Sequence, residues 1–161
     1  MSTPPEVTIR RARPEEAAAL AAISTRAFDT DLAVGAPGPG GPPGYDSPDW
    51  QSEAMGWGEY YAVVVDEQLA GGAIVSGLGS RVWHLGRLFL DPDHHGRGIG
   101  RRAMALLWEA YPGARRWTLD TPAWNRRTRR FYESLGFVET GRELTPAGWE
   151  LVLYERVCPP P

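Results

Sequence analysis

The residues with the clearest chemical meaning lie between Leu88 and Ala103, where an apolar segment runs into a glycine-rich loop. This stretch reads Leu-Phe-Leu-Asp-Pro-Asp-His-His-Gly-Arg-Gly-Ile-Gly-Arg-Arg-Ala. Glycines leave the backbone N–H groups of a loop accessible, and N–H groups at the start of a helix attract anions. Arg97, Arg101 and Arg102 add positive charge to the same loop. The pattern therefore indicates a binding site for a nucleotide-like diphosphate.

Part of this loop fits the dinucleotide-binding fingerprint G-x-G-x-x-G/A. Gly98 and Gly100 would be its first two glycines, and Asp120 lies near the distance expected of a ribose-binding acid. In a dinucleotide fold the first glycine directly follows the strand, whereas residues 91–97 separate Leu90 from Gly98. About half of the chain also precedes the loop. A dinucleotide enzyme is therefore the weaker interpretation.

The same loop resembles motif A of the GNAT superfamily of N-acetyltransferases, whose pattern is Q/R-x-x-G-x-G/A. Gly98 and Gly100 match this pattern, while His95 stands where the family usually has Gln or Arg. The main contribution of that position is a backbone N–H group. We therefore expect histidine to be tolerated there.

A second segment, from Asn125 to Phe137, resembles motif B of the same family. It contains Phe131 and Tyr132 and ends in Leu-Gly-Phe. Both motifs occur in the family's order and at a suitable spacing. The resemblance extends over roughly residues 60–156, with a weaker similarity over residues 7–28.

The resemblance implies an α/β fold of the mixed α+β kind. The family has a central mixed, mostly antiparallel sheet with helices on both faces, and its splayed fourth and fifth strands hold coenzyme A. The periodicity of the chain agrees with this arrangement. We expect strands at 7–10, 60–65, 69–75, 81–90, 116–121, 137–142 and 149–156, and helices from Pro14, from Pro48, over 99–111 and over 125–135.

Acetyl-coenzyme A is the cosubstrate that the resemblance implies. The backbone of Leu88 and Leu90 is expected to hold the pantetheine arm, while the glycine-rich loop holds the diphosphate. Motif B adds Arg129, and Asn125 as a pantetheine ligand, as the N-cap of its helix, or as both. The expected cofactor-binding residues are Leu88, Leu90, His95, Gly96, Arg97, Gly98, Ile99, Gly100, Arg101, Arg102, Asn125 and Arg129.

Acetyl transfer from a thioester to an amine needs a base for the amine and an acid for the departing thiolate. Tyr132 matches the motif B tyrosine and is the expected acid, with a packing role as its alternative. His84 stands where many relatives carry Glu on the fourth strand, so it is the expected base. Glu59 and Asp120 are the alternative bases. No metal is expected, because Cys158 is the only cysteine and the chain has no H-E-x-x-H spacing.

The net charge of −3 conceals two blocks of opposite sign. Residues 97–130 contain nine arginines and two acidic residues, which suits the phosphates of coenzyme A; nucleic acid is the less favoured partner. Residues 29–59 contain six acidic residues and no basic residue. This acidic block is a candidate attractor for a cationic amine, with an ordinary solvated surface as the equal alternative.

The length of 161 residues is that of one domain, so residues 1–161 are expected to form a single unit. Within it, residues 35–58 are expected to form a mobile loop beside the acceptor, and residues 157–161 a proline-rich tail. No apolar run approaches the ~20 residues that span a membrane, and no signal-peptide pattern precedes Val7. Together with the lone cysteine, this favours a cytoplasmic location.

The expected function is direct transfer of an acetyl group from acetyl-coenzyme A to a primary amine of a small molecule or peptide. The alternative from another class is a catalytically weak regulator that binds coenzyme A. Many family members form dimers, so a homodimer is the expected candidate assembly.

Overall fold

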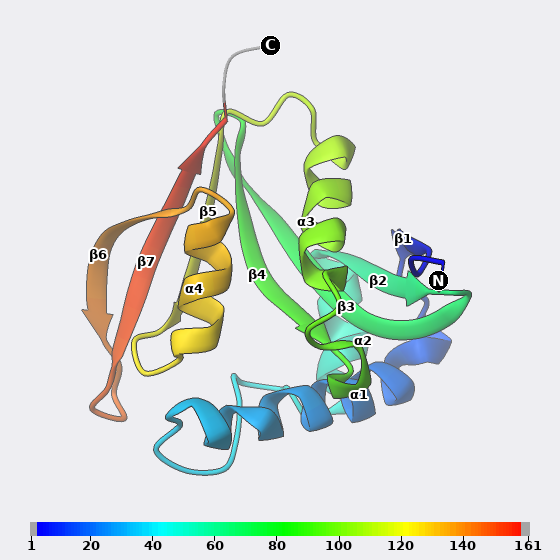
Figure 1. The fold of residues 1–161 in the computed structure, drawn as a ribbon, viewed down its shortest axis with the longest axis horizontal. Helices are drawn as coiled ribbons and strands as arrows, with labels where there is room; N and C mark the ends of the chain where they lie inside the picture. The colour runs from blue at the N-terminus through cyan, green and yellow to red at the C-terminus, as the bar shows by residue number, and fades with distance from the viewer. Residues whose placement is uncertain (1–2, 159–161) are drawn as a thin grey trace.

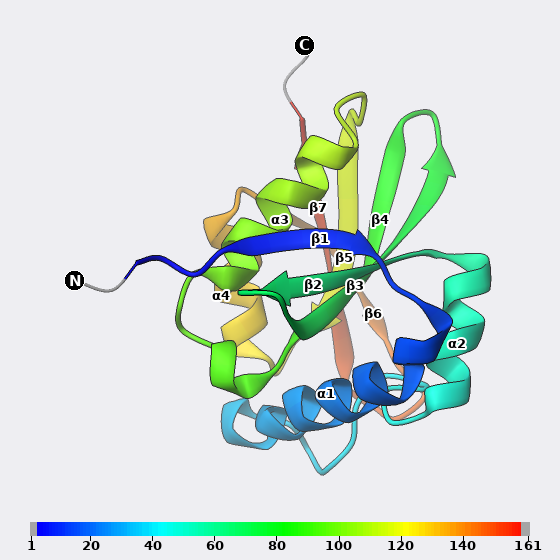
Figure 2. The ribbon, with the colours of Figure 1, turned by 90° about the vertical axis from the view of Figure 1, so that its right-hand side faces the viewer.

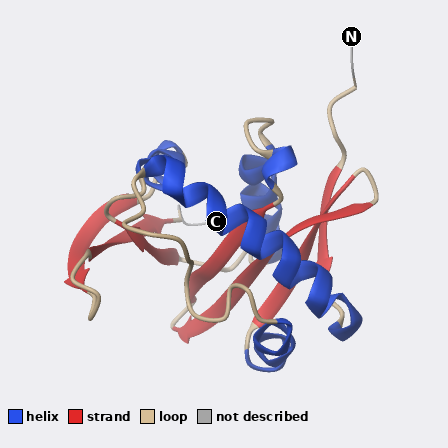
Figure 3. Cartoon of the chain, turned by 90° about the horizontal axis from the view of Figure 1, so that it is seen from below, coloured by secondary structure: helices blue, strands red, loops and turns tan. Residues whose placement is uncertain are grey.

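The computed structural model describes residues 3–158 as a sheet with helices on both of its faces (Figure 1, Figure 2 and Figure 3). The strands are β1 (Val7–Arg11), β2 (Glu59–Val65), β3 (Gln68–Gly79), β4 (Val82–Leu90), β5 (Arg116–Pro122), β6 (Val138–Leu144) and β7 (Glu150–Val157). The α-helices are α1 (Ala17–Asp29), α2 (Pro48–Trp57), α3 (Ile99–Ala110) and α4 (Arg126–Ser134). Short 3-10 turns cover Pro14–Glu16, Thr30–Val34 and Pro92–His94.

The seven strands lie in the order β1-β2-β3-β4-β5-β7-β6. All neighbouring strands are antiparallel except β4 and β5, which run parallel. The expected mixed, mostly antiparallel sheet is thereby confirmed.

Strands β4 and β5 separate soon after they begin. Only residues 82–84 of β4 pair with residues 116–118 of β5, and no pairing of the two strands continues beyond His84 in the described chain. Figure 1 shows the two strands together at the top and progressively apart below. On its other edge β4 remains paired with β3 as far as Leu90. The lower half of β4 therefore has one unpaired edge.

Each face of the sheet is covered because its helices carry apolar residues at helical spacing. On one face α3 buries Ile99, Ala103, Met104 and Leu107. The other face is covered by α1 and α2, and the buried residues of this layer are Leu20, Ile23, Ala27, Ala54, Tyr60, Ile74 and Phe89. Strand β4 contributes to both layers, which places its side chains alternately on the α3 face and on the α1–α2 face.

Two element boundaries differ from the sequence expectation by more than two residues. The first helix is preceded by a 3-10 turn, in which the Glu16 carboxylate accepts a hydrogen bond from the Arg13 N–H at 2.9 Å. Strand β3 continues to Gly79, beyond the expected end at residue 75. It does so because Ser80 and Arg81, both with positive φ, form the tight turn into β4. Positive φ at both central residues is typical of a type I′ hairpin turn.

The region expected as a loop, residues 35–58, is irregular only in its first part. Helix α2 occupies residues 48–57, as Pro48 indicated, and the Ser47 hydroxyl caps it by accepting a hydrogen bond from the Trp50 N–H at 3.1 Å. Of the expected proline-rich tail, residues 159–161 lie outside the described residues. None of the helices within residues 3–158 combines the length and the apolar character that crossing a membrane requires.

Candidate functional site

The free edge of β4 presents the backbone groups of Leu88 and Leu90. The Asp91 N–H donates to the Ala70 carbonyl at 2.7 Å, which continues the antiparallel β3–β4 ladder as a hydrogen-bonded pair. Hydrogen-bonded and non-hydrogen-bonded pairs alternate along such a ladder, so Leu90 and Leu88 belong to non-hydrogen-bonded pairs. Their N–H and C=O groups therefore point away from β3, toward the side from which β5 has diverged.

The glycine-rich loop carries a series of free backbone donors to the start of α3. Gly98 is the N-cap residue of α3 with φ of 78°, and Gly96 has φ of 73°, a left-handed conformation that favours glycine. Within the described chain, the N–H groups of residues 96–101 donate to no backbone or side-chain acceptor. Nothing lies within 4 Å of the position that a Gly98 Cβ would take. Free N–H groups at the positive end of a helix suit phosphate oxygens.

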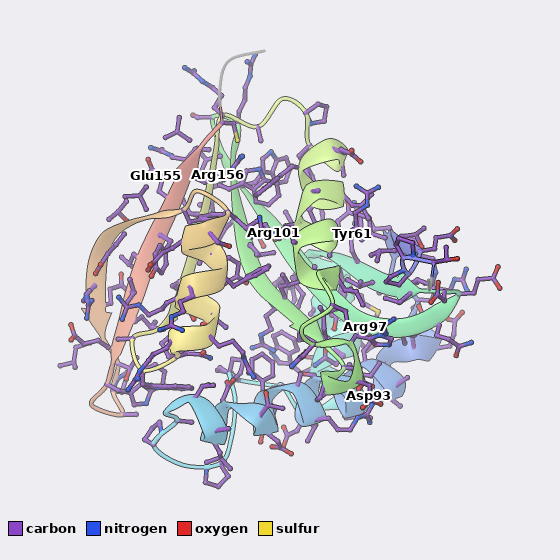
Figure 4. All side chains as sticks on the ribbon, viewed as in Figure 1. Tyr61, Asp93, Arg97, Arg101, Glu155 and Arg156 are labelled. Atoms are coloured by element: carbon purple, nitrogen blue, oxygen red, sulfur yellow. The ribbon has the colours of Figure 1, made fainter. Side chains whose placement is uncertain are left out.

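Three arginines surround this loop without a carboxylate partner in the part of the chain that is described. Arg97 and Arg102 line a surface pocket of about 290 Å³ beside the start of β1. Arg101 lies between α3 and α4, where its guanidinium donates to the Ser134 hydroxyl at 2.8 Å (Figure 4). Their charge is therefore available to an anionic ligand at the start of α3.

His95 differs from its expected role. Its backbone N–H, expected to be available to the ligand, donates to the Pro92 carbonyl at 3.1 Å within the turn. Its ring Nε2 lies 2.9 Å from the Leu90 carbonyl. The residue thus shapes the loop between β4 and Gly96, and the free donors begin one residue later.

Asn125 acts as the N-cap of α4, and its side-chain oxygen accepts from the Thr128 N–H at 3.1 Å. Its side-chain NH₂ donates to Asp31 at 3.2 Å, and the residue is only 3% exposed. The sequence left open whether Asn125 caps the helix, binds pantetheine or does both, and the structure shows that it caps the helix. A hydrogen bond to pantetheine stays a prediction.

Arg129 is engaged on the β7 side of α4. Its guanidinium donates to the Tyr154 hydroxyl at 3.3 Å and to the Ala123 carbonyl at 3.2 Å. These contacts hold α4 to the loop that precedes it and to β7. A contact of Arg129 with the cofactor stays a prediction.

Tyr132 lies in α4 with its ring packed against Phe131 and Phe137. The residue is 8% exposed, and its hydroxyl has no hydrogen-bond partner in the described chain. Burial and then the negative charge of Asp120 raise the pKa of this hydroxyl above its usual range. The phenol consequently keeps its proton at neutral pH, as a proton donor must.

His84 is the last residue of β4 that pairs with β5, so it lies where the two strands begin to separate. Its ring Nδ1 is 2.8 Å from the Thr118 hydroxyl of β5, which leaves Nε2 for another partner. Of the alternative bases, Glu59 forms an ion pair with Arg11 at 2.8 Å, while Asp120 is exposed on β5. The geometry therefore favours His84.

The acidic block of residues 29–59 does not form one uncompensated surface. Asp31 is 8% exposed and pairs with Arg127 of α4 at 3.1 Å, and burial raises the pKa of its carboxyl against the opposing effect of Arg127. Glu59 is paired as described above. The acidic residues of this block that remain exposed and without an ion pair are Asp29, Asp46, Asp49 and Glu53.

Sequence reasoning missed Arg87, which lies in β4 beside Leu88. The signal was present, because Arg87 is the only Asp, Glu, Lys or Arg between Val82 and Leu90 in an otherwise largely apolar strand. Within residues 3–158, no three His, Cys, Asp or Glu side chains lie close enough to share a metal ion.

A model of the family described as "Acetyltransferase (GNAT) family" matches residues 26–137, more than half of the chain. A comparison with curated protein sequences gave no match. Among solved structures, the PaiA N-acetyltransferase from Thermoplasma acidophilum in complex with coenzyme A is similar, with a TM-score of 0.74 and 16% identity over 95% of this chain and 99% of that chain.

Two Escherichia coli structures are similar as well. The apo form of YjaB has a TM-score of 0.69 and 26% identity, over 94% of this chain and 98% of that chain. The ribosomal-protein-S18-alanine N-acetyltransferase has a TM-score of 0.69 and 19% identity, over 94% of both chains. At these low identities the structural similarity is a similarity of fold.

Proposed function

Because this chain belongs to the GNAT family of acetyltransferases, which use acetyl-coenzyme A as the acetyl donor, we propose that it transfers the acetyl group directly to a primary amine of a small molecule or peptide. We further propose that residues 1–161 form one acetyltransferase domain, with residues 35–58 on its acceptor side. The observation that carries the proposal is the unpaired edge of β4. In Figure 1 this edge lies between α3, at whose start the free donors of the glycine-rich loop are found, and α4, the helix that contains Tyr132.

The residues around this edge fit the chemistry of coenzyme A. The open space at Gly98 and the free N–H groups of residues 96–101 suit a diphosphate, and Arg97, Arg101 and Arg102 supply compensating charge. The N–H and C=O of Leu88 and the N–H of Leu90 suit the amides of the pantetheine arm, because they point away from β3 and can form strand-like hydrogen bonds. The Leu90 carbonyl is already in contact with His95 Nε2. These are the residues that would hold the cosubstrate.

Bound acetyl-coenzyme A supplies a thioester whose carbonyl carbon is attacked and whose sulfur leaves. His84 accepts the proton that the amine loses, through Nε2, while Thr118 holds Nδ1. Tyr132 donates its hydroxyl proton to the departing sulfur. One N–C bond forms and one C–S bond breaks. His84 then releases the proton it has gained to solvent, and Tyr132 regains a proton from solvent.

The exposed acidic residues of the block 29–59 support the proposal that the acceptor is cationic. Asp46, Asp49 and Glu53 lie at and before α2, on the side of the sheet opposite α3. An exposed cluster of like charge raises the local concentration of oppositely charged molecules, and added salt weakens this effect.

Acetyl transfer is tested by mixing the purified protein with acetyl-coenzyme A and a panel of primary amines. We expect thiol release that depends on the amine, with one N-acetylated product, identified by mass spectrometry, for each thiol. Thiol release without acetylated amine would instead identify a hydrolase. Binding of coenzyme A without thiol release would favour the regulatory alternative.

A further inference from the structure

We infer that the acceptor amine also bears a carboxylate, and that the guanidinium of Arg87 binds this carboxylate. The inference rests on the proposed acetyl transfer and narrows its substrate class to molecules of the amino-acid kind. It concerns the face of the sheet opposite the glycine-rich loop.

Arg87 reaches this face from the unpaired part of β4. Its strand partner Ile74 belongs to the layer covered by α1 and α2, and the Arg87 side chain contacts Trp50 of α2. The next residue, Leu88, presents its backbone to the free edge of β4. Arg87 therefore lies beside the place where the edge becomes accessible from the α1–α2 side.

The guanidinium of Arg87 is held in place but has no counter-ion. Its Cζ lies 3.9 Å from the centroid of the Trp50 ring, and its Nη2 donates to the Pro43 carbonyl. Its Nη1 is buried without a hydrogen-bond partner in the described chain. None of the carboxylates within residues 3–158 forms an ion pair with it.

The electrostatic surroundings of Arg87 are those of an unpaired cation. Burial lowers the pKa of its guanidinium to about 10, and the only opposing influence is the Tyr60 hydroxyl. Tyr60 is itself neutral, because burial raises its pKa above the usual range. A buried charge without a counter-ion is unfavourable, so the guanidinium of Arg87, whose side chain is only partly buried, gains from an anion that approaches its accessible part.

A carboxylate is the anion that this geometry suits. The guanidinium is a planar fork that binds the two oxygens of a carboxylate side by side, and its stacking on Trp50 fixes the plane of the fork. A purely structural arginine could anchor the loop before α2 through Pro43 alone. That role leaves the buried Nη1 without an acceptor.

His84 and Arg87 are three positions apart in β4, a span of at most about 10 Å along a strand. Strict alternation would place them on opposite faces, but the β3–β4 register shifts between them, with Gly86 as an extra residue. Since Trp83 and Leu85 belong to the α3 layer, His84 lies on the same face as Arg87. An arginine and a histidine side chain at this spacing suit the carboxylate and the amine of one amino-acid-sized molecule.

The test compares the L-amino acids with their C-terminal amides as acceptors, since each pair differs only in the carboxylate. We expect the wild-type protein to show a higher kcat/KM for the acids. In Arg87→Gln the ratio of kcat/KM for the acids to kcat/KM for the amides should fall by roughly 10- to 100-fold, the range for hydrogen bonds to charged groups. Arg87→Lys should show an intermediate loss, because the ammonium keeps the charge without the fork.

The matched control is Arg142→Gln, which removes a guanidinium from β6, where it pairs with Glu139 at 2.6 Å. It should leave the preference for acids unchanged. Equal kcat/KM for acids and amides in the wild type, or an equal loss for both in Arg87→Gln, would overturn the inference.

A binding measurement keeps this test separate from the test of acetyl transfer. The protein is first loaded with coenzyme A, and N-acetyl-amino acids or their amides are then titrated into it in a calorimeter. This measurement requires no acetyl transfer. We expect the acids to bind at least about tenfold more tightly in the wild type, with the difference lost in Arg87→Gln and partly kept in Arg87→Lys. Failure of all amines to be acetylated would refute the proposed function. Equal binding of acids and amides would refute the role of Arg87.

Discussion

Gly100 of α3 and Phe131 of α4 are fitted closely together: a Cβ on Gly100 would lie 3.2 Å from Cζ of Phe131. The two segments that resemble family motifs therefore touch each other at a glycine. Gly98 has a different role, because its constraint is a positive φ and its Cβ position is open. Glycine is therefore needed at position 98 for its backbone conformation and at position 100 for the close approach of the Phe131 ring.

The first prediction concerns this contact. Gly100→Val should lower the free energy of unfolding by about 1–3 kcal/mol, because the added side chain overlaps the Phe131 ring. Phe131→Leu in the same chain should restore part of the loss, and a double-mutant cycle by denaturant unfolding measures the coupling. Gly113→Val is the control, since nothing lies within 4 Å of its Cβ position. Additive effects of the two changes would show that the contact carries no energy.

The second prediction concerns the proton donor. Tyr132→Phe keeps the packing against Phe131 and Phe137 and removes only the hydroxyl. We expect kcat to fall by about 10- to 1000-fold with the affinity for coenzyme A unchanged, as measured by steady-state kinetics and calorimetry. Tyr154→Phe is the matched control, because the Tyr154 hydroxyl donates a hydrogen bond to Glu133 and has no part in the proposed chemistry. Equal kcat in wild type and Tyr132→Phe would reduce Tyr132 to a packing residue.

A third prediction concerns the base. His84→Gln retains a polar group near Thr118 but cannot take up a proton, so kcat/KM near neutral pH should fall by about 100-fold. The deficit should shrink as the pH approaches the ordinary amine pKa of about 10.4, because the acceptor then deprotonates in solution. A pH–rate profile of both proteins checks this. A deficit that is the same at every pH would mean that His84 only positions its neighbours.

The fourth prediction concerns acid stability. Arg10 and Glu16 form two hydrogen bonds of 2.8 Å, and the Arg10 guanidinium lowers the pKa of the Glu16 carboxyl from its ordinary value of 4.5. A carboxyl with a lowered pKa in the folded state stabilises the protein above its unfolded pKa. This contribution is lost as the pH falls through the folded value.

Glu16→Gln should therefore lower the free energy of unfolding at pH 7 by about 1 kcal/mol. The difference from the wild type should shrink as the pH falls below 4.5. Thermal unfolding at several pH values measures this difference. Glu15→Gln serves as the control, because Glu15 is exposed and outside this pair. A difference that is independent of pH would assign the effect to packing.

Most elements of the fold could be predicted from the sequence because their periodicity is local. The alternation in β1 and the Pro48 start of α2 are examples. The end of β3 could not, because Ser80 and Arg81 take up positive φ without the glycine or asparagine that usually marks such a turn. The separation of β4 from β5 was expected only from the family resemblance. It depends on which strands pair, and local sequence does not contain that information.

The candidate site was predictable to a similar extent. The glycine-rich loop follows from composition, but Asn125 and Arg127 meet Asp31 across more than ninety positions of the chain, and no local pattern indicates such a contact. Because of this contact, Asp31 is paired and is not available to attract an amine, as the acidic block was expected to do. Arg87 was overlooked because a single arginine in a strand belongs to no motif. Its isolation in a largely apolar strand was a signal, but its buried, unpartnered Nη1 is visible only in the structure.

The central claim is that the free edge of β4 and the loop before α3 together hold coenzyme A, and NMR titration of the ¹⁵N-labelled protein tests it most directly. On addition of coenzyme A, the amide signals of Leu88, Leu90 and residues 96–101 should shift the most, because these N–H groups gain hydrogen-bond acceptors. In Gly98→Ala the shifts of the loop should weaken, because a residue with a side chain disfavours φ of 78° and covers the donors. Shifts confined to β6 and β7, or no shifts at saturating coenzyme A, would contradict this account.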